Sequence, residues 1–302
     1  MLNSNNKFAA AAAAPIILNV ILIISILISY SQGLNIAKQL SYGVTFAGII
    51  QLIFLISITL KFYRPNIRLS FKITSKVKFF FKKLLPSIFS SGVTQINILV
   101  GTIIASFQSG AVSYLYYADR VYQINLAIAG IAVGTVSLPA LSKAFQLKNK
   151  LKISNIQNKS LQLSLLFSVP ASLGLIIASE EIIDGLFGYG SFTIKDVEMT
   201  SNALMFFGYG VIAFALIKIL ANFFFARDNT ITPFYISSFI VFLNVMISII
   251  FFDKVGFLII PIATSISTWI GVFIFLYLLL KRNHLFLQRK LFYSLLKILI
   301  SP

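Results

Sequence analysis

The chain has 302 residues, of which 58% are hydrophobic and only 11% are charged. A soluble domain carries roughly 25% charged residues, so this composition excludes an ordinary soluble fold and is typical of a polytopic membrane protein. The absence of cysteine excludes disulfides, thiolate metal sites and a cysteine nucleophile. The net charge of +17 could suggest nucleic acid, but the charges lie between apolar runs, so we expect no nucleic-acid partner.

Apolar runs predict an all-α polytopic membrane protein with about eight transmembrane helices. Each run is close to the ~20 apolar residues that cross ~30 Å of hydrocarbon. In chain order, the predicted spans are Ala9–Tyr30, Leu40–Lys61, Leu84–Phe107, Val112–Leu138, Leu161–Ala178, Thr200–Phe225, Thr232–Phe252 and Val255–Leu280.

The distribution of charge predicts the orientation. If the first helix starts in the cytoplasm, most of the 25 basic residues lie in cytoplasmic segments. The segment Lys143–Lys159 has five lysines and no acid, whereas Glu180–Glu198 holds five of the eight acids. We therefore expect the first segment inside and the second outside. Arg227 and the loop lysines are expected to be topology charges that are individually dispensable.

A basic segment divides the predicted helices into two groups. Residues 1–62 hold two helices, residues 84–281 hold six, and residues 282–302 form a cytoplasmic segment and the start of a further, truncated helix. In residues 63–83, bulky apolar and basic residues alternate. This pattern fits either an amphipathic linker helix on the anionic inner leaflet, with membrane lipids as partners, or a plain solvated linker.

The stretch Val112–Lys143 carries charge inside a membrane span. It reads VSYLYYADRVYQINLAIAGIAVGTVSLPALSK, with Asp119 and Arg120 roughly 12 Å along the predicted helix. An arginine at that depth is costly unless it faces protein, water or an anion, so Arg120 is a functional candidate. The alternative is a buried Arg–Asp pair that only locks helices together. Neighbouring positions on a helix diverge by about 100°, so the two side chains should not share a partner.

Polar residues recur on one face of this predicted helix. They are Ser113, Tyr117, Arg120 and Gln123. The same stripe is expected to continue in the small residues Ala127, Gly130 and Gly134. We expect the polar part to face a cavity and the small part to face a close neighbouring helix.

Three isolated polar residues allow narrower expectations. Lys218, inside the sixth span, could supply a second positive charge to the cavity or extend toward the cytoplasmic surface. Asn244 is expected to form an interhelical hydrogen bond. His284 is the only histidine, which excludes a His-pair metal site. We expect no enzyme activity, no bound metal and no cofactor.

The string SYLYYADRVYQ, followed by GIAVGTVSLPALSK, resembles the signature helix of the MurJ/MviN lipid II flippase family. Further segments resemble the family in the same order along the chain. They are LNSNNKFAAAAAAPIILN, LLPSIFSSGVTQINILVGTIIASF, LFGYGSFT and ALIKILANFFFARDNTITP. The family belongs to the multidrug/oligosaccharidyl-lipid/polysaccharide exporter superfamily. Its members have about fourteen helices in two six-helix lobes plus a final pair.

The resemblance implies that this chain is a partial family member in the cell inner membrane. It would keep two helices of the first lobe and all six of the second, without the first helices and the last pair. The implied function is movement of lipid II, the undecaprenyl-linked peptidoglycan precursor, to the outer leaflet by alternating access. This role in peptidoglycan synthesis and cell wall biogenesis, and so in cell shape, involves no covalent chemistry.

The resemblance also implies the substrate-binding residues. Arg120 matches the family's cavity arginine and would attract the lipid diphosphate, with Asp119 beside it. Tyr117 and Gln123 would add polar contacts. The cavity arginines that the family carries on its early helices have no counterpart here. Asn222 stands where the family usually has a proline.

Two other functions remain open at this stage. The chain could belong to an exporter of another polyprenyl-linked glycan or of a drug, and a drug exporter would show acids facing the cavity. It could also be a non-transporting remnant, or half of a split flippase whose partner is a separate chain carrying the missing N-terminal helices.

Single cysteines test the predicted orientation, because the chain has no native cysteine. In intact spheroplasts, an impermeant maleimide is expected to label Gly190→Cys and to leave Lys150→Cys unlabelled. The reason is that basic loops stay in the cytoplasm during insertion. The reverse labelling pattern would overturn the orientation.

Overall fold

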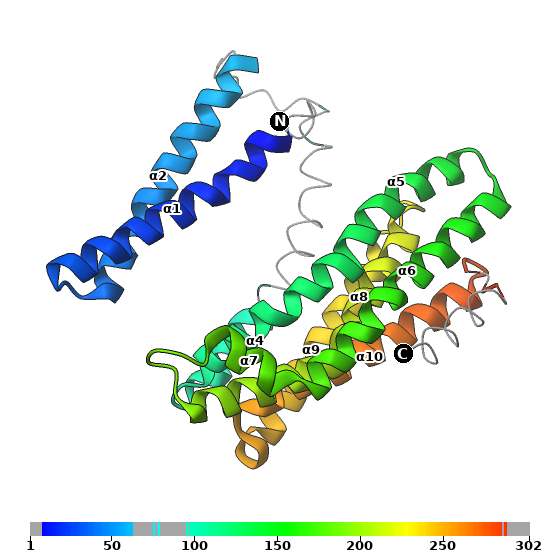
Figure 1. The fold of residues 1–302 in the computed structure, drawn as a ribbon. Coiled ribbons are helices and arrows are strands. Elements are labelled where there is room, and N and C mark those ends of the chain that lie inside the picture. Colours follow the sequence, from blue (N-terminus) through cyan, green and yellow to red (C-terminus); the bar gives the residue numbers. More distant parts are fainter. Residues whose placement is uncertain are drawn as a thin grey trace. The chain divides into compact units, whose positions relative to one another are not determined.

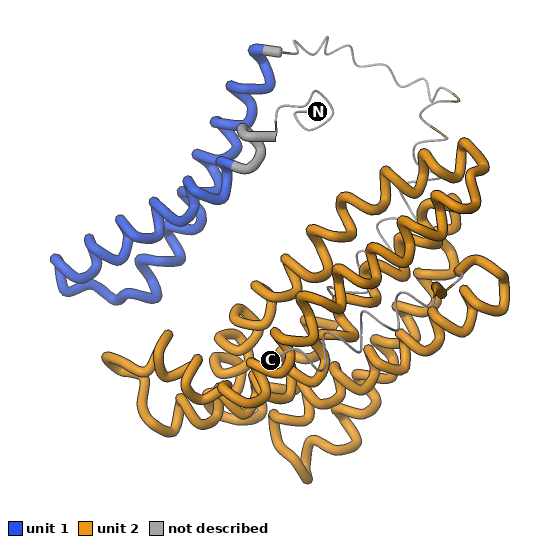
Figure 2. The backbone as a smooth tube through the Cα atoms, turned by 45° about the vertical axis from the view of Figure 1, so that its right-hand side comes forward, with its two compact units in different colours: residues 1–74 blue, residues 75–302 orange. Residues whose placement is uncertain are grey.

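The computed structural model describes residues 8–62, 75, 78, 95, 97–285 and 287–288. These residues form helices joined by short turns, as the apolar runs predict (Figure 1). They divide into two compact units, residues 1–74 and residues 75–302 (Figure 2). Most of the predicted linker 63–83, and residues 289–302 with the predicted start of a further helix, lie outside the described part.

The first unit is a hairpin of α1 (Phe8–Gln32) and α2 (Ile36–Phe62), reversed at Gly33 with a φ of 63°. The two helices approach closely at Ser25 and Gly43, because a Cβ on this glycine would collide with the serine hydroxyl. Farther along, Gln51 Nε2 donates a hydrogen bond of 2.8 Å to the Ala14 carbonyl. Small residues therefore let the backbones meet, as is usual between helices in lipid.

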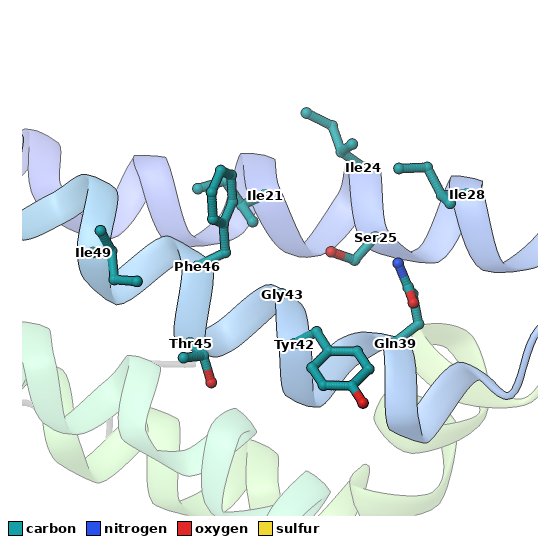
Figure 3. Close-up of a pocket in the computed structure, with 10 residues that line it drawn as sticks. All are labelled: Ile21, Ile24, Ser25, Ile28, Gln39, Tyr42, Gly43, Thr45, Phe46 and Ile49. Carbon is teal, nitrogen blue, oxygen red and sulfur yellow. The ribbon is translucent and has the colours of Figure 1, made fainter.

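An open cleft of about 500 Å³ lies between these two helices (Figure 3). Its lining is mostly apolar, with Ile21, Ile24 and Phe46 beside the polar side chains of Ser25 and Gln39. Large apolar side chains also cover the outer faces of the hairpin. In a bilayer such faces contact lipid, so their exposure fits membrane-spanning helices.

The second unit contains the rest of the described helices. They are the helical segment Asn97–Ser106, α4 (Ala111–Leu126), the π-helical turn η2 (Ala127–Ala132), α5 (Val133–Gln146), α6 (Lys150–Ile177), α7 (Ser179–Phe187), α8 (Ile194–Phe225), α9 (Ile231–Val255), the 3₁₀ turn η3 (Gly256–Leu258) and α10 (Ile259–Lys281). α4, η2 and α5 run on as one long helix (Figure 1).

α8 is the central helix of this unit, and α4, α6 and α10 pack against it. Small and polar residues allow these contacts. A Cβ on Gly208 would lie 3.2 Å from Leu175 Cβ of α6, and Ser172 Oγ donates to the Gly208 carbonyl at 2.7 Å. On the α10 side, Ser265 Oγ donates to the Phe206 carbonyl at 2.8 Å. The helices of the second unit therefore pack with their backbones close to that of α8.

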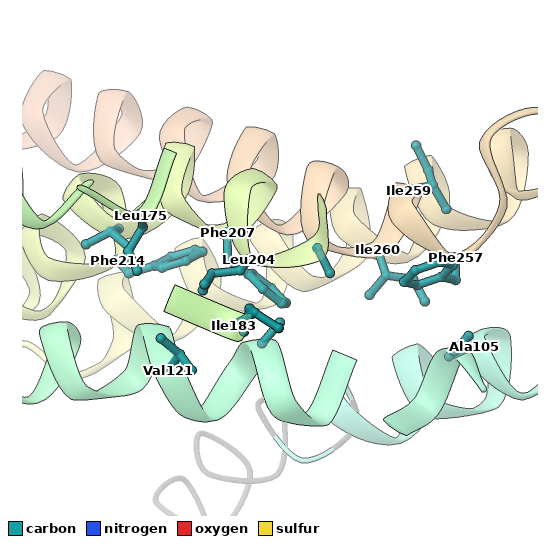
Figure 4. Close-up of a cluster of buried hydrophobic side chains, with 14 of the residues drawn as sticks. Ala105, Val121, Leu175, Ile183, Leu204, Phe207, Phe214, Phe257, Ile259 and Ile260 are labelled. Carbon is teal, nitrogen blue, oxygen red and sulfur yellow. The ribbon is translucent and has the colours of Figure 1, made fainter. Parts of the chain in front are cut away.

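Buried apolar side chains form one cluster around the first half of α8 (Figure 4). Leu204 and Phe207 of α8 meet Val121 of α4 and Ile183 of α7 there, with Phe257 from η3. α7 falls inside the predicted outer loop Glu180–Glu198 and was not predicted, because hydropathy detects apolar length rather than helicity. Its apolar face covers this cluster, while Glu180 and Glu181 stay exposed.

The predicted spans and the observed helices correspond, with differences at some of their ends in the described part. α8 begins at Ile194 rather than at Thr200. The predicted span Leu84–Phe107 is described only over Asn97–Ser106. α6 begins at Lys150 rather than at Leu161, because its polar first turns are helical although they are not apolar. The predicted span Val112–Leu138 continues to Gln146 and is interrupted by η2.

The two predicted loops lie at opposite ends of the second unit. At the end with the acidic loop, Tyr114 of α4 donates its hydroxyl to Asp196 of α8 at 2.8 Å. At the other end, Gln157 Nε2 of α6 donates to the His284 carbonyl at 2.9 Å, and the Gln288 amide donates to Asn158 Oδ1 at 2.9 Å. The chain therefore alternates between the two ends as predicted.

Arg227 is more than a topology charge, and that part of the expectation is wrong. Its guanidinium donates to the carbonyls of Phe223 and His284, and its Cζ lies 4.3 Å from the centroid of the Phe145 ring. The half-buried side chain thus joins the end of α8, the end of α5 and the segment after α10. Burial lowers the pKa of Arg227 to about 10. The two carbonyls offset the cost of burying this charge, because the carbonyls at helix C-termini attract cations.

We expect Arg227→Ala to destabilise the chain by about 2 kcal/mol, because hydrogen bonds to a charged donor are lost and two carbonyls lose a partner. Arg282→Ala is the matched control, since Arg282 is exposed and its hydrogen bond to Thr232 is long, at 3.4 Å. Thermal unfolding in detergent measures both. Equal stability of the two variants would contradict the anchoring role of Arg227.

His284 should make stability depend on pH. Burial, together with the charges of Arg227 and Arg282, lowers the pKa of His284 below its ordinary value of 6.5. As the pH falls through about 6.5, the unfolded chain therefore takes up the proton first. The contribution of His284 to the free energy of unfolding is therefore complete above about pH 6.5 and decreases as the pH falls below it. Unfolding measured between pH 7.5 and 5.5 should show this slope, and His284→Asn should reduce it; an unchanged slope would refute the linkage.

Candidate functional site

The site predicted from the sequence lies on the long helix Ala111–Gln146. Of its predicted small residues, Gly130 and Gly134 contact α8, whereas Ala127 is exposed. A Cβ on Gly130 would lie 3.1 Å from Ala215 Cα, and one on Gly134 would lie 3.0 Å from Asn222 Nδ2. The same Asn222 Nδ2 donates to the Gly134 carbonyl at 2.9 Å. The predicted close neighbour is therefore α8. Asn222 therefore joins the two helices.

The polar residues and the small residues do not form one continuous stripe, so that expectation is wrong. Gly130 and Gly134 are buried against α8, whereas Tyr117 and Arg120 are exposed. The cause is η2, whose wider turn takes up about one residue more than an α-helical turn. One residue corresponds to roughly 100° of rotation, which turns the outer half of the helix relative to the inner half.

Asp119 and Arg120 point in different directions, as predicted from their spacing. Asp119 is half-buried and accepts hydrogen bonds from Gln123 Nε2 and from the Tyr122 hydroxyl. The Tyr122 ring packs on Phe207 of α8, with ring centroids 4.7 Å apart. The carboxylate is thus held by its own helix, on the side that packs into the unit.

Arg120 is exposed, and its Cζ lies 4.7 Å from the centroid of the Tyr116 ring. In the part of the chain that the structure describes, it forms neither a hydrogen bond nor an ion pair with protein. The alternative of an Arg–Asp lock between helices is therefore not what these residues form. An exposed guanidinium without an acidic partner is available to an anion.

Tyr117 belongs to an aromatic cluster near the N-terminal end of α4. Its ring centroid lies 4.8 Å from that of Phe187 and 5.5 Å from that of Phe192. The neighbouring Tyr116, which was not singled out from the sequence, lies under Arg120 instead. The signal that could have found it is the spacing of one helical turn between a tyrosine and an arginine.

Lys218 is exposed on α8 but lies far from Arg120. Ala215, which is in contact with Gly130, precedes it by less than a turn, so Lys218 lies close to the level of η2. That level is roughly 15–20 Å along the helix axis from Arg120. The structure therefore brings Asp119 and Gln123 together and leaves Lys218 at a different depth.

Asn244 forms the interhelical hydrogen bonds predicted for it. Its Nδ2 donates to Asn97 Oδ1 at 2.8 Å and to Thr264 Oγ1 at 3.2 Å. Ser248 Oγ donates to Asn244 Oδ1 at 3.4 Å. This buried group joins the segment Asn97–Ser106 to α9 and α10, which satisfies polar side chains inside an apolar bundle.

A family model described as "Lipid II flippase MurJ" matches residues 1–301. The chain belongs to the MurJ lipid II flippase family. It is 36% identical over 290 residues to a probable lipid II flippase MurJ of Rhizobium meliloti (strain 1021), a match that covers 94% of this chain and 54% of the relative.

Solved structures support the MurJ assignment. A lipid II flippase MurJ in an inward closed conformation matches with a TM-score of 0.79 and 29% identity, covering 98% of this chain and 60% of that one. An inward-facing multidrug resistance MATE family transporter of the MOP superfamily matches with a TM-score of 0.75, covering 91% of this chain and 64% of that one. At 13% identity, this second match shows only that the two chains share a fold.

The chain spans about half the length of the MurJ relatives that it matches. Membership of the family, together with the long apolar helices, places it in the inner membrane as a multi-pass protein. The sequence-based assignment to the MurJ/MviN family is confirmed.

Proposed function

We propose that the chain is part of a lipid II flippase that moves the undecaprenyl-linked peptidoglycan precursor from the inner to the outer leaflet by alternating access. The observation that carries this proposal is Arg120, exposed on the family's signature helix and free of an acidic partner among the described residues. The proposed function is transport, with no covalent chemistry and no requirement for a cofactor.

Arg120 is proposed to contact the lipid diphosphate. A guanidinium offers N–H donors in a planar fork that matches two phosphate oxygens at once. At membrane depth the surroundings screen charge poorly, so one such contact is stronger than in water. Asp119 does not cancel this attraction through a close ion pair, because Gln123 and Tyr122 hold its carboxylate.

The remaining candidate residues are proposed to act around Arg120 or below it. The Tyr117 hydroxyl would supply a polar contact at the outer end of the same helix. Gln123 would act mainly by holding Asp119, to which its amide is bonded. Lys218 would attract the diphosphate at a depth nearer the cytoplasm, because it lies close to the level of η2.

The other half of the cavity is proposed to come from helices like those in the unmatched part of the relatives, in the same polypeptide or in a separate partner chain. Transporters of this kind move substrate between two halves that rock around a central site. The rival function, export of a drug or of another polyprenyl-linked glycan, shares this requirement. A site for a cationic drug would need a free carboxylate, whereas Asp119 is already hydrogen-bonded, which makes drug export the weaker proposal.

Arg120 is expected to be essential in a complete form of the flippase. Arg120→Ala should abolish complementation of a flippase-depleted strain, and Arg120→Lys should be impaired because an ammonium lacks the bidentate fork. Lys150→Ala, at the exposed start of α6, is the control and should complement fully. Full complementation by Arg120→Ala would remove Arg120 from the mechanism.

Expressed alone, the chain should insert in the membrane but should not flip lipid II. Insertion depends on hydrophobic segments and basic loops, both of which are present. Transport depends on two opposing halves, and a single exposed arginine attracts a diphosphate weakly. Co-expression of a chain with the relatives' N-terminal helices should restore activity. Translocation of lipid II by the purified chain in liposomes, without a partner, would contradict this expectation.

A further inference from the structure

Arg120 lies over the ring of Tyr116, which is one turn before it on α4. The guanidinium carbon lies 4.7 Å from the ring centroid, within the range of a cation–π interaction. The two residues are one turn apart on α4, so the helix itself brings them together. A contact of this kind favours the orientation of the guanidinium in which its face lies on the ring.

Tyr116 is itself held by a row of aromatic side chains. It meets Tyr117 edge to face, with ring centroids 6.2 Å apart and an interplanar angle of 78°. Tyr117 packs in turn on Phe187 and Phe192, which end α7 and precede α8. Aromatic pairs at these distances and angles attract each other. The row therefore connects Arg120 to the fold at the outer end of the bundle.

An aromatic partner differs from a carboxylate partner in one way that matters for binding an anion. A carboxylate would neutralise the arginine and take up its N–H donors. A tyrosine ring attracts the cation through its quadrupole, carries no net charge and leaves the donors free. Arg120 can thus be held in place while it keeps its full charge for phosphate oxygens.

We infer that Tyr116 is a positioning residue for Arg120, and that Tyr117 braces it against Phe187 and Phe192. The inference rests on the proposed binding of a lipid diphosphate by Arg120. It adds a residue that acts through the arginine and predicts that the aromatic ring, not the hydroxyl, carries the effect.

The first measurement needs no ligand. The chain, labelled with ¹⁵N-arginine and placed in lipid nanodiscs, gives one side-chain Nε–H signal for each arginine, and Arg120→Lys identifies that of Arg120. A ring-current shift of this signal is expected in wild type and in Tyr116→Phe, and its loss in Tyr116→Leu. Tyr235→Leu, on an exposed tyrosine of α9, is the control and should change nothing. An Arg120 signal that is the same in Tyr116→Leu and in wild type overturns the inference.

The second measurement uses undecaprenyl diphosphate as the probe. Tyr116→Leu should weaken its binding by about two- to fivefold, the equilibrium equivalent of a cation–π contact at an exposed site. Tyr116→Phe should bind as wild type does. Variants with one, two and three fluorines on a phenylalanine ring at position 116 should bind the probe progressively more weakly. The reason is that fluorine withdraws electron density and makes the face of the ring less negative. A merely structural role would not follow that series.

The outcomes separate the two proposals. If wild type and Tyr116→Leu bind the probe equally well, the positioning role is wrong while the proposed function stands. If Arg120→Ala binds the probe as well as wild type does, the proposed function is wrong and the positioning role falls with it. A stepwise fluorine effect that disappears in Arg120→Ala supports both.

Discussion

The fold of the second unit depends on the close approach of helix backbones to α8. Helices in lipid gain little from hiding apolar side chains, because the surrounding tails are equally apolar. What holds them together is dense packing and hydrogen bonds between helices. Gly208 and Ser172 provide this toward α6, Ser265 toward α10, and Gly130 toward the long helix that carries Arg120. Each of these positions has a small side chain, which lets the backbones meet.

Two arginines in the described part of the second unit contact an aromatic ring, and their other contacts differ. Arg227 and Arg120 each lie over such a ring. Arg227 also gives its N–H donors to two carbonyls, so its hydrogen-bonding capacity serves the fold. Arg120 keeps its donors free among the described residues, so its charge can serve a ligand. The same residue type thus stabilises the fold at Arg227, whereas at Arg120 it is proposed to bind an anion.

Much of the fold could be predicted from the sequence, because a helix must carry about 20 apolar residues in a row to cross a bilayer. The spans, their alternation, the interhelical role of Asn244 and the divergence of Asp119 from Arg120 all follow from composition and helical geometry. Helices that are not apolar, such as α7 and the first turns of α6, escaped this reasoning.

The parts of the site that could not be predicted depend on tertiary register. No pattern in the sequence says that Arg227 meets His284, or that Asn222 bonds to the Gly134 carbonyl. The prediction that placed Arg120 and Gly134 on one face assumed an unbroken α-helix, and η2 invalidates it. Tyr116 was within reach of sequence reasoning, since its spacing from Arg120 is local.

The turn η2 also has a consequence for how such sequences change over time. It holds about one residue more than an α-helical turn would, so losing a residue there could convert it to ordinary helix. Such a deletion would leave hydropathy, loop charges and membrane topology nearly as they were. It would nevertheless rotate the outer half of the helix by roughly 100°, turning Arg120 to a different face. At this one place, a change in length that is invisible to any hydropathy profile would redirect the site's positive charge.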